Sequence, residues 1–274
     1  MNDHIDLLLQ RFSIKSRVFF AGNLCNITNF DAAHGVAHLH VLRAGRLDVI
    51  PSVGPSLQLE RPSLLLFPLP TSHRLIPAQP GGADMTCSSV EFGLGLGNPL
   101  VQALPGLMLV PLADAPGLQA ILDVFFDEAF NTKQGQSAAL RRLAELVLIL
   151  TIRHALERGL LKSGMMSGLA DPRLSKTLQA IHDRPAEAWT LHSMADTAGM
   201  SRARFAHHFQ RVVGAPPGDY LNQWRISVAQ SLLLRGKSLG LIADEVGYGS
   251  ATALTRAFTG RVGLSPTSWL ASRE

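Results

Sequence analysis

The chain has 274 residues, of which 46% are hydrophobic and 17% are charged. This composition excludes a disordered or low-complexity chain and supplies enough apolar side chains for about two domains. No apolar run reaches the roughly 18 residues that a membrane-spanning helix needs, and the acidic start of the chain does not resemble a signal peptide. Two cysteines make no disulfide scaffold. We therefore expect a cytoplasmic protein that does not enter the membrane.

Charge is distributed unevenly along the chain. Residues 1–171 contain 13 Lys and Arg against 14 Asp and Glu, whereas residues 172–274 contain 12 against 7, a net charge of +5. Ten of those 12 basic residues are Arg, whose planar guanidinium suits bidentate contacts with phosphate and guanine. The basic C-terminal part therefore favours a nucleic-acid partner.

Residues 17–92 have the pattern of β-strands. Short apolar or alternating runs are separated by Gly and Pro at intervals of about ten residues, which is typical of an antiparallel sandwich or barrel. The predicted strands include residues 36–42, 46–50, 57–59 and 64–67.

The pattern becomes helical over residues 116–158, because apolar side chains there recur at intervals of three and four residues. Residues 159–171 are rich in small side chains and are predicted to form a flexible linker. Another helix is predicted to follow, with Asp171 as its N-cap and Pro172 at its first helical position.

Two segments of the C-terminal part, residues 191–220 and 239–269, resemble each other. Equivalent residues are 48 positions apart up to Gly199 and 49 positions apart beyond it. Two copies are too few for a solenoid, so each copy is interpreted as a separate unit. The matched pairs include Ala195 and Ala243, Asp196 and Asp244, Gly199 and Gly247, Phe205 and Leu254, Phe209 and Phe258, Pro217 and Pro266, and Tyr220 and Trp269.

Each unit has the pattern of a helix-turn-helix, with a break at Gly199 in the first unit and at Gly247 in the second. The second helix of such a pair is the one that enters the major groove of DNA. A long helix over residues 218–235 is predicted to join the two units. The predicted N-caps are Thr190, Ser201, Ser238 and Ser250.

At these residues the sequence resembles the AraC/XylS family of bacterial transcription regulators, over roughly residues 172–272. The resemblance implies a seven-helix domain that binds double-stranded DNA and a regulator that acts with RNA polymerase. The matching motifs are Ala195-Asp-Thr-Ala-Gly-Met-Ser-Arg202, Phe205-x3-Phe209, Tyr220-Leu-x3-Arg225, Ile242-Ala-Asp-Glu-Val-Gly-Tyr248, Leu254-Thr-Arg-Ala-Phe258 and Gly263-Leu-Ser-Pro266.

Helical geometry indicates which residues of the two second helices point away from the protein. The residues predicted to face inward are Phe205, Phe209 and Val212 in the first unit and Leu254, Phe258 and Val262 in the second. Outward positions and the groove-facing positions implied by the family resemblance together give a candidate DNA-binding set. Arg256 is the best candidate for a contact with guanine or phosphate. The full set is Arg202, Ala203, Arg204, His207, Gln210, Ser250, Thr252 and Arg256.

The N-terminal part resembles the cupin-like sensor domains of AraC-type regulators. His38-Leu-His40 with Gly45, and Pro68-x-Pro70-Thr-Ser-His73, are similar to the two cupin motifs. No Glu follows His40 at the family's spacing, and Pro77 stands where an Asn is usual, so the catalytic metal ligands are incomplete. We expect no enzyme, and a cupin-type metalloenzyme joined to a binding module is the alternative.

Two thiols and two imidazoles form a second candidate site, made of Cys25, His40, His73 and Cys87. This set is chemically complete for tetrahedral Zn, so Zn or another divalent metal is a candidate cofactor. The same set suits oxidant sensing by a Cys25–Cys87 pair, as in a branch of the family that responds to reactive chlorine species. In a third interpretation the cysteines are buried core residues and the regulator responds to a small molecule. The first two interpretations predict that Cys25 and Cys87 lie close together.

These observations predict an α+β protein. Residues 1–115 are expected to form a cupin-like β-barrel or jelly roll, and residues 116–158 to form coupling or dimerisation helices. Residues 159–171 are the predicted linker, and residues 172–274 the predicted DNA-binding domain. The expected function is signal-dependent, sequence-specific binding of promoter DNA by a homodimer.

Overall fold

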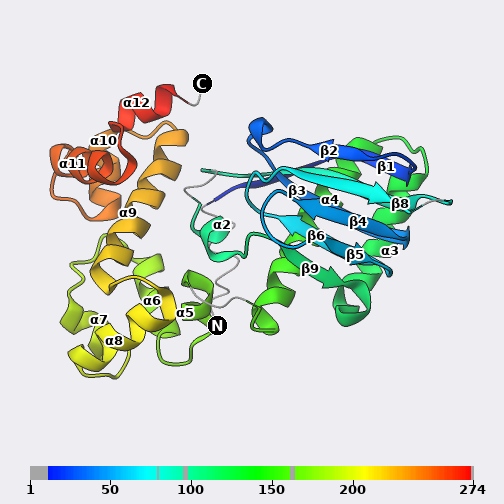
Figure 1. Cartoon of the computed structure of the whole chain (residues 1–274). Coiled ribbons are helices and arrows are strands. Elements are labelled where there is room, and N and C mark those ends of the chain that lie inside the picture. The colour runs from blue at the N-terminus through cyan, green and yellow to red at the C-terminus, as the bar shows by residue number, and fades with distance from the viewer. Residues whose placement is uncertain (1–11, 79, 95–97, 161–163, 273–274) are drawn as a thin grey trace. The chain divides into compact units, whose positions relative to one another are not determined.

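The described part of the chain forms two compact units, seen in the computed structural model of Figure 1. The β-rich unit comprises residues 14–92 and 104–158. The helical unit comprises the other described residues, of which the chain from residue 159 onward is the main part. The residues that the structure describes are 12–78, 80–94, 98–160 and 164–272.

The strands of the β-rich unit pair in an antiparallel manner and form two sheets. The larger sheet has the order β1-β8-β3-β6-β9, and the smaller sheet has the order β2-β7-β4-β5. This arrangement confirms the predicted antiparallel sandwich. The strands are β1 (Ile14–Leu24), β2 (Thr28–Phe30), β3 (Ala37–Gly45), β4 (Leu47–Pro51), β5 (Leu57–Leu59), β6 (Ser63–Phe67), β7 (His73–Pro77), β8 (Ala83–Phe92) and β9 (Met108–Pro111).

A hydrophobic core joins the two sheets. Leu42 and Phe67 of the larger sheet and Leu47 of the smaller sheet are buried in one cluster. Side chains alternate between the two faces of a strand, so Leu39 and Val41 of β3 lie on the opposite face from Leu42. These two residues are also buried, which means that the larger sheet is covered on both faces.

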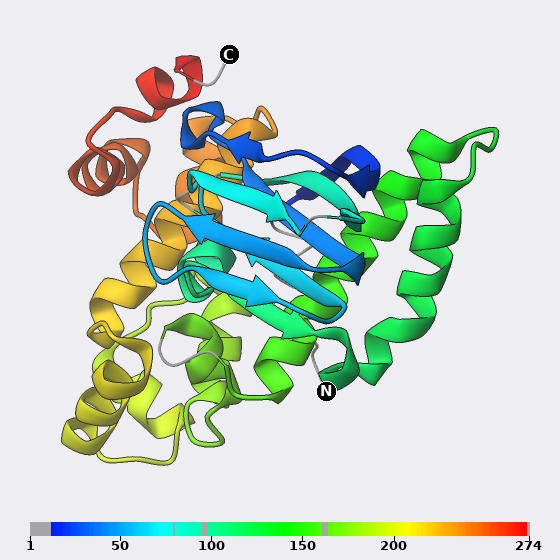
Figure 2. The same cartoon turned by 45° about the vertical axis from the view of Figure 1, so that its right-hand side comes forward.

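Two helices form the outer layer of the β-rich unit. Helices α3 (Pro116–Phe130) and α4 (Gln136–Glu157) pack against each other and against β1 (Figure 2). Their apolar stripes contribute fully buried residues such as Phe125 and Val147, so burial confirms the helical pattern predicted for residues 116–158. Short 3-10 helices, η1 (Ala32–His34) and η3 (Leu112–Asp114), connect neighbouring elements.

The helical unit consists of short helices around one long helix, α9, which confirms the long connecting helix predicted from the sequence. No described helix is both long and apolar enough to cross a membrane. The helices are α2 (Pro99–Ala103), α5 (Met165–Ala170), α6 (Ser175–Asp183), α7 (Leu191–Thr197), α8 (Arg202–Val213), α9 (Pro217–Leu234), α10 (Leu239–Val246), α11 (Ala251–Val262) and α12 (Pro266–Ala271).

The linker prediction for residues 159–171 is wrong for its second half. Helix α5 lies within this segment, and its Met166 and Leu169 are buried in the helical unit. Small residues permit flexibility, but Gly168 here allows close packing, because a Cβ at this position would lie 2.5 Å from the Leu178 side chain. The small residues of this segment therefore serve helix packing.

The helix predicted to start at Pro172 begins three residues later, at Ser175. The Asp171 carboxylate accepts hydrogen bonds from the N–H groups of Arg173 and Leu174. Asp171 thus caps a turn that leads into the helix. The Asp171-Pro172 pattern marks the start of this turn, and the helix itself begins only after the turn.

The division of the chain also differs from the predicted domain boundaries. The described part of residues 93–103, expected in the N-terminal domain, packs with the helical unit, where α2 contacts α5. The Phe12 ring belongs to the same unit and meets the Trp224 ring edge-on, with 5.6 Å between the ring centroids. Residues 116–158, expected to form a separate segment, pack with the sheets of the β-rich unit.

Candidate nucleic-acid interface and histidine cluster

The first helix-turn-helix unit is formed by α7 and α8. The Thr190 hydroxyl accepts a hydrogen bond from the Ser193 N–H at 3.1 Å, and the Ser193 hydroxyl accepts one from the Thr190 N–H at 2.9 Å. This reciprocal capping box starts α7. Gly199 then adopts a left-handed φ of 63°, which ends the helix and turns the chain toward α8. Ser201 lies at the predicted N-cap of α8, although its side chain makes no capping hydrogen bond.

The second unit, α10 and α11, has the same plan with a more constrained turn. Gly247 adopts a φ of 79°, and a Cβ at this position would lie 2.7 Å from both the Cα and the carbonyl oxygen of Ala186. Only glycine fits this approach of two backbone segments. The Ser250 hydroxyl accepts a hydrogen bond from the Ala253 N–H at 3.1 Å and caps α11 as predicted.

The inward-facing residues of the two second helices match the predictions with one difference in each unit. Phe205, Phe209, Leu254 and Phe258 are fully buried. The third inward residue of α8 is Val213 instead of the predicted Val212, which is half-buried, and Val262 of α11 is half-buried as well. Val212 and Val262 lie in the last turns of α8 and α11, which end at Val213 and Val262. Fewer neighbours cover a side chain at a helix end than in the middle of a helix, so these two residues are only half-buried.

All members of the predicted DNA-binding set are exposed. Arg202, Ala203, Arg204, His207 and Gln210 lie on the outer surface of α8. Ser250, Thr252 and Arg256 lie at the start and on the outer surface of α11. A residue on the second helix of a helix-turn-helix unit must be exposed in order to contact base edges, and these residues are. Which of them contacts DNA stays a prediction.

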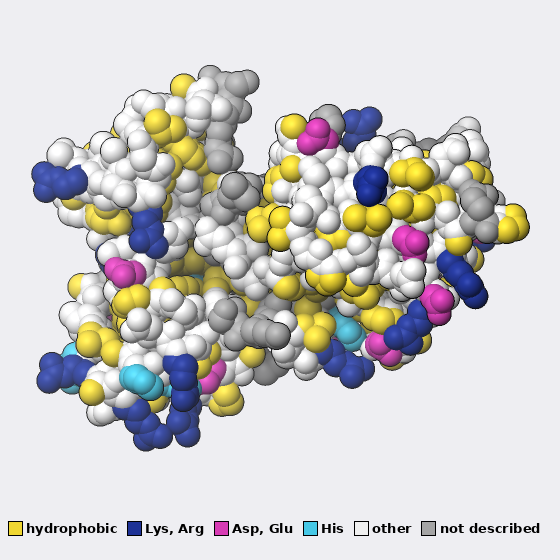
Figure 3. Space-filling view, in the orientation of Figure 1, with side chains coloured by type: hydrophobic (Ala, Val, Ile, Leu, Met, Phe, Trp, Pro, Cys, Tyr) yellow, Lys and Arg dark blue, Asp and Glu magenta, His cyan; other side chains and the backbone are white. Residues whose placement is uncertain are grey.

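Basic side chains gather on one face of the helical unit. Figure 3 shows Lys, Arg and His side chains clustered over α7 and α8, with further basic side chains over α10 and α11. Few acidic side chains interrupt the cluster on this face (Figure 3). A surface of this kind attracts the phosphates of nucleic acid.

His208 is a buried position that supports α8, and the sequence analysis did not identify it. It is 9% exposed, and its Nε2 lies 2.9 Å from the Asp171 carboxylate. Its Nδ1 lies 2.9 Å from the guanidinium of Arg211, which can only donate. Nδ1 therefore accepts from Arg211 while the Nε2–H donates to Asp171. His208 therefore connects α8 to the turn that precedes α6. Its position three residues after Phe205 places it on the inward face of α8, and this spacing could have predicted its burial from the sequence.

Arg225, the last residue of the motif Tyr220-Leu-x3-Arg225, joins three segments of the helical unit. Its Nε donates to the carbonyl oxygen of Pro185 and its Nη2 donates to that of Glu187, both at 2.8 Å. The guanidinium also lies 5.8 Å from the centre of the Tyr248 ring. Arg225 thus joins α9 to the loop before α7 and to the turn of the second unit.

The β-rich unit contains a cluster of three histidines between its sheets. His38 and His40 lie on the same face of β3, and His73 lies on β7 of the other sheet. The Nε2 atoms of His40 and His73 are 2.8 Å apart. Phe67 stacks on one side of His73 with 4.0 Å between centroids, and Phe30 stacks on it with 4.7 Å.

The hydrogen bonds define the protonation of this pair. The His73 Nδ1 lies 2.7 Å from the Thr71 carbonyl oxygen, so Nδ1 carries the proton and the His73 Nε2 accepts from the His40 Nε2–H. Burial lowers the pKa of both His40 and His73, and the neighbouring imidazoles lower that of His40 further. Both rings are therefore neutral near pH 7.

The prediction that Cys25 and Cys87 lie close together is wrong. Cys87 pairs with Phe20 across β8 and β1, whereas Leu24 pairs with Ala83, so Cys25 lies beyond the far end of this pairing. Cys25 is five positions after Phe20 and directly follows the end of β1, which corresponds to about 16 Å of extended chain. A disulfide requires Cα atoms within about 7 Å.

The two thiols also have different surroundings. Cys87 is 2% exposed in the hydrophobic core, and burial raises the pKa of its thiol to about 12. Cys25 is exposed, and its Sγ lies 2.9 Å from the Asn23 side-chain oxygen. Cys87 therefore matches the interpretation of a core residue, and the four predicted residues do not form one site.

Of the four predicted zinc ligands, the fold brings only His40 and His73 together. Among the described residues, no group of three or more His, Cys, Asp and Glu side chains is placed to hold a metal ion. The Nε2 atoms of His40 and His73 satisfy each other in a hydrogen bond. The predicted Cys and His site for Zn is therefore not assembled in this fold.

Two sheets with a cupin-type histidine pair, joined to two helix-turn-helix units with exposed basic residues, define a DNA-binding protein with a cupin domain. Residues 3–157 match the family model described as Cupin, and residues 194–272 match the model described as Helix-turn-helix domain. The chain belongs to the AraC family of helix-turn-helix proteins with an N-terminal cupin domain.

Curated relatives agree with this assignment. An AraC-like transcription regulator of Streptomyces lividans is 36% identical over 64% of this chain and 59% of its own length. AlkR of Acinetobacter baylyi, an HTH-type transcriptional regulator, is 32% identical over the same shares. The chain thus spans about three fifths of the length of these relatives. The RCS-specific transcriptional activator RclR of Escherichia coli is 25% identical over 87% of both chains. All three are named as transcriptional regulators or activators, the class of protein predicted for this chain.

One solved structure is similar to part of this chain. The DNA-binding domain of AdpA, solved in complex with a target DNA, is 28% identical over 37% of this chain and 92% of that chain, with a TM-score of 0.35.

Proposed function

We propose that the chain is a sequence-specific DNA-binding transcription regulator. The observation that carries this proposal is the exposure of the whole predicted DNA-binding set on the second helices of two helix-turn-helix units. The two helices would enter neighbouring segments of the major groove, about one helical turn apart on one face of the duplex. RNA polymerase is the partner through which a regulator bound at a promoter would act.

Binding of the full chain to the DNA upstream of its own gene tests this proposal. Fluorescence anisotropy would compare this duplex with a shuffled duplex of the same composition. We expect tighter binding to the upstream duplex, and a loss of that preference in the double variant His207→Ala, Arg256→Ala. Equal binding of both duplexes by the unchanged chain would contradict sequence-specific recognition.

The signal that controls DNA binding has two candidate forms. A small-molecule ligand is supported by a cavity of about 450 Å³ beside the histidine cluster, lined by residues that include Phe30, His73, Asp31 and Arg74. Oxidant sensing is supported by the exposed thiol of Cys25 and by the similarity to a regulator named as RCS-specific. In this second form Cys25 reacts alone, because Cys87 is buried and distant.

Hypochlorite treatment of the full chain separates the two forms. Oxidant sensing predicts that hypochlorite changes the affinity for DNA in the unchanged chain and in Cys87→Ala, but not in Cys25→Ser. Cys87→Ala is the matched control, because it removes the other thiol. Unchanged affinity after oxidation in all three proteins would favour the small-molecule form.

A second copy of the chain is the proposed partner at the outer surface of α3 and α4. Val124 is 54% exposed on α3, and Leu146 is 40% exposed on α4. Leu143 and Leu150, each half-buried, continue the stripe of Leu146 at intervals of three and four residues. An apolar stripe of this spacing on a helix surface suits packing against the same stripe of a second copy.

Oligomeric state in solution tests this surface. We expect a dimer by light scattering, and a monomer for the double variant Val124→Asp, Leu146→Glu. The control is Val53→Asp, which places a charge at an apolar residue that is 81% exposed elsewhere in the same unit. A dimer that persists in the double variant would exclude this interface.

A further inference from the structure

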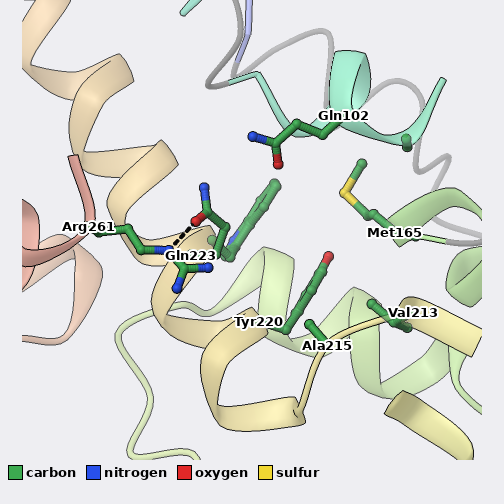
Figure 4. A pocket seen from close by; sticks show the side chains of 10 residues that line it. Gln102, Met165, Val213, Ala215, Tyr220, Gln223 and Arg261 are labelled. Atoms are coloured by element: carbon green, nitrogen blue, oxygen red, sulfur yellow. Dashed lines mark hydrogen bonds between the residues drawn. The ribbon is translucent and has the colours of Figure 1, made fainter. Parts of the chain in front are cut away.

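The helical unit contains a cavity of about 360 Å³ that none of the predicted DNA contacts uses. It lies between α2 and α5 on one side and α9 and the end of α11 on the other (Figure 4). Its volume is within the range of pockets that hold small organic ligands.

The inner wall of the cavity is apolar. Met165, Val213 and Trp224 line it and are 5%, 6% and 1% exposed. Ala103 adds a small buried side chain from α2. The buried phenol ring of Tyr220 also faces the cavity, and its hydroxyl is hydrogen-bonded to the Nε2 of His182 at 2.5 Å. The interior therefore suits the apolar body of a ligand.

The described part of the cavity mouth is polar and carries one cation. Gln102 and Arg261 are exposed, and Gln223 is half-buried beside them. The Arg261 Nε donates to the Gln223 side-chain oxygen at 2.5 Å, as Figure 4 shows. Among the residues that the structure describes, no Asp or Glu lines the cavity and Arg261 takes part in no ion pair. The guanidinium thus has donors available for an anion.

We propose that this cavity binds a small organic anion with an apolar body, which lies against Met165 and Trp224 while its acidic group pairs with Arg261. Arg261 donates to the neutral side-chain amide of Gln223. An acidic group would give the guanidinium a charged partner, and hydrogen bonds between two charged groups are stronger than those to a neutral amide. The side-chain amide of Gln223 supplies further donors at the mouth.

The position of the cavity gives its ligand an influence on DNA binding, and this part of the inference rests on the proposed function. Val213 ends the second helix of the first helix-turn-helix unit, and Arg261 lies near the end of the second helix of the other. A ligand that contacts both would bias the separation of the two helices. The separation decides whether both fit neighbouring major-groove segments.

A fluorescent probe pair tests the site in the full chain without DNA. Anilinonaphthalenesulfonate has an apolar body and an anionic group, and N-phenylnaphthylamine has the same body without the charge. Energy transfer from tryptophan reports binding near the cavity, because Trp224 lines it. We expect the sulfonate to bind about tenfold more tightly than the neutral probe.

Three variants decide where the probes bind. Arg261→Gln should weaken sulfonate binding about tenfold and leave the neutral probe unchanged. Gln102→Trp and Ala215→Trp, at an exposed and a half-buried lining position, should exclude both probes. Arg173→Gln, which removes an exposed charge from the same unit, is the matched control and should change neither.

The proposal is overturned if Arg261→Gln and Arg173→Gln weaken sulfonate binding equally, or if both Trp variants keep the unchanged energy transfer. Because these measurements need no DNA, their failure is distinguishable from a failure of sequence-specific DNA binding.

Discussion

The two helix-turn-helix units share one backbone plan but differ at equivalent outward positions. In the middle of the second helix, His207 of the first unit corresponds to Arg256 of the second. Arginines flank this position in the first unit, where the second unit has residues without a polar side chain. The flanking pairs are Arg202 and Ala251, Arg204 and Ala253, and Arg211 and Gly260.

From this difference we infer that α8 and α11 contribute differently to DNA binding. Arginines spread along both sides of a groove-facing helix are placed to reach the phosphates of both strands, which adds affinity without sequence preference. A single arginine at the centre of the facing surface is placed to reach base edges. We infer that the first unit supplies most of the electrostatic affinity and that Arg256 supplies a larger share of the specificity.

The largest expected effect concerns the turns of the two units. Gly247→Ala should lower the free energy of unfolding by about 3–5 kcal/mol, because the new Cβ meets the Ala186 backbone and the left-handed φ is strained. Gly199→Ala should cost only about 1–2 kcal/mol, because its φ is similar but open space surrounds the position. Urea unfolding followed by tryptophan fluorescence measures both.

Tryptophan fluorescence selects the relevant unit, since Trp189, Trp224 and Trp269 are the three tryptophans of the chain and all lie in the helical unit. Equal losses in the two variants would show that the second turn is no more constrained than the first.

The next effect separates base readout from phosphate contact. Arg256→Ala should weaken binding to the upstream duplex by about 1–3 kcal/mol, the usual contribution of one bidentate contact with guanine. Binding to a shuffled duplex should change little. His207→Ala, the equivalent change in the first unit, should cost less than about 1 kcal/mol, because a neutral imidazole offers a single hydrogen bond. Anisotropy titrations with both duplexes at one salt concentration provide the comparison.

If Arg256→Ala instead weakened both duplexes to the same extent, Arg256 would be a phosphate contact, and the two units would not differ in the way inferred.

A third effect tests how each second helix is held in place. His208 ties α8 to Asp171, whereas the equivalent residue of α11 is Ala257. His208→Ala should lower the free energy of unfolding of the helical unit by about 1–2 kcal/mol, since it leaves the Asp171 carboxylate and Arg211 with one partner fewer. His207→Ala is the matched control, because it changes helix propensity equally at an exposed position. Equal stability of the two variants would show that the tie is not needed.

Sequence patterns predicted the helical unit well because its features are local. The caps Thr190 and Ser250, the turn glycines and the inward positions of Phe205 and Phe258 depend on neighbours within a few positions, and the structure confirms them. The role of His208 depends on Asp171, which lies 37 residues earlier. A pattern of helix faces identifies His208 as inward but gives no information about its partner.

The Cys and His prediction failed for a related reason. Residue type made Cys25, His40, His73 and Cys87 a chemically sensible set, and the fold does bring His40 and His73 together. The register between β1 and β8 decides where Cys25 lies, and a shift of several residues moves it along the strand by many ångströms. Composition and spacing do not determine this register, so sequence reasoning joined residues that the sheet keeps apart.

The smallest expected effect concerns the salt dependence of DNA binding. The logarithm of the association constant falls linearly with the logarithm of salt concentration, with a slope of about 0.9 for each phosphate contact. Arg204→Gln should reduce the steepness of this slope by about 0.9 on both the upstream and the shuffled duplex, because it removes one phosphate contact and no base contact. The reverse change, Ala253→Arg, places an arginine at the equivalent position of α11 and should steepen the slope by about the same amount. Anisotropy titrations of the three proteins across a salt series measure both slopes.

If Ala253→Arg left the slope unchanged while Arg204→Gln reduced it, the outer surface of α11 would lie farther from the phosphates than that of α8, and the two helices would approach DNA with different tilts. If neither variant changed the slope, the flanking arginines of the first unit would not contact phosphate, and the proposed division between the two units would fail.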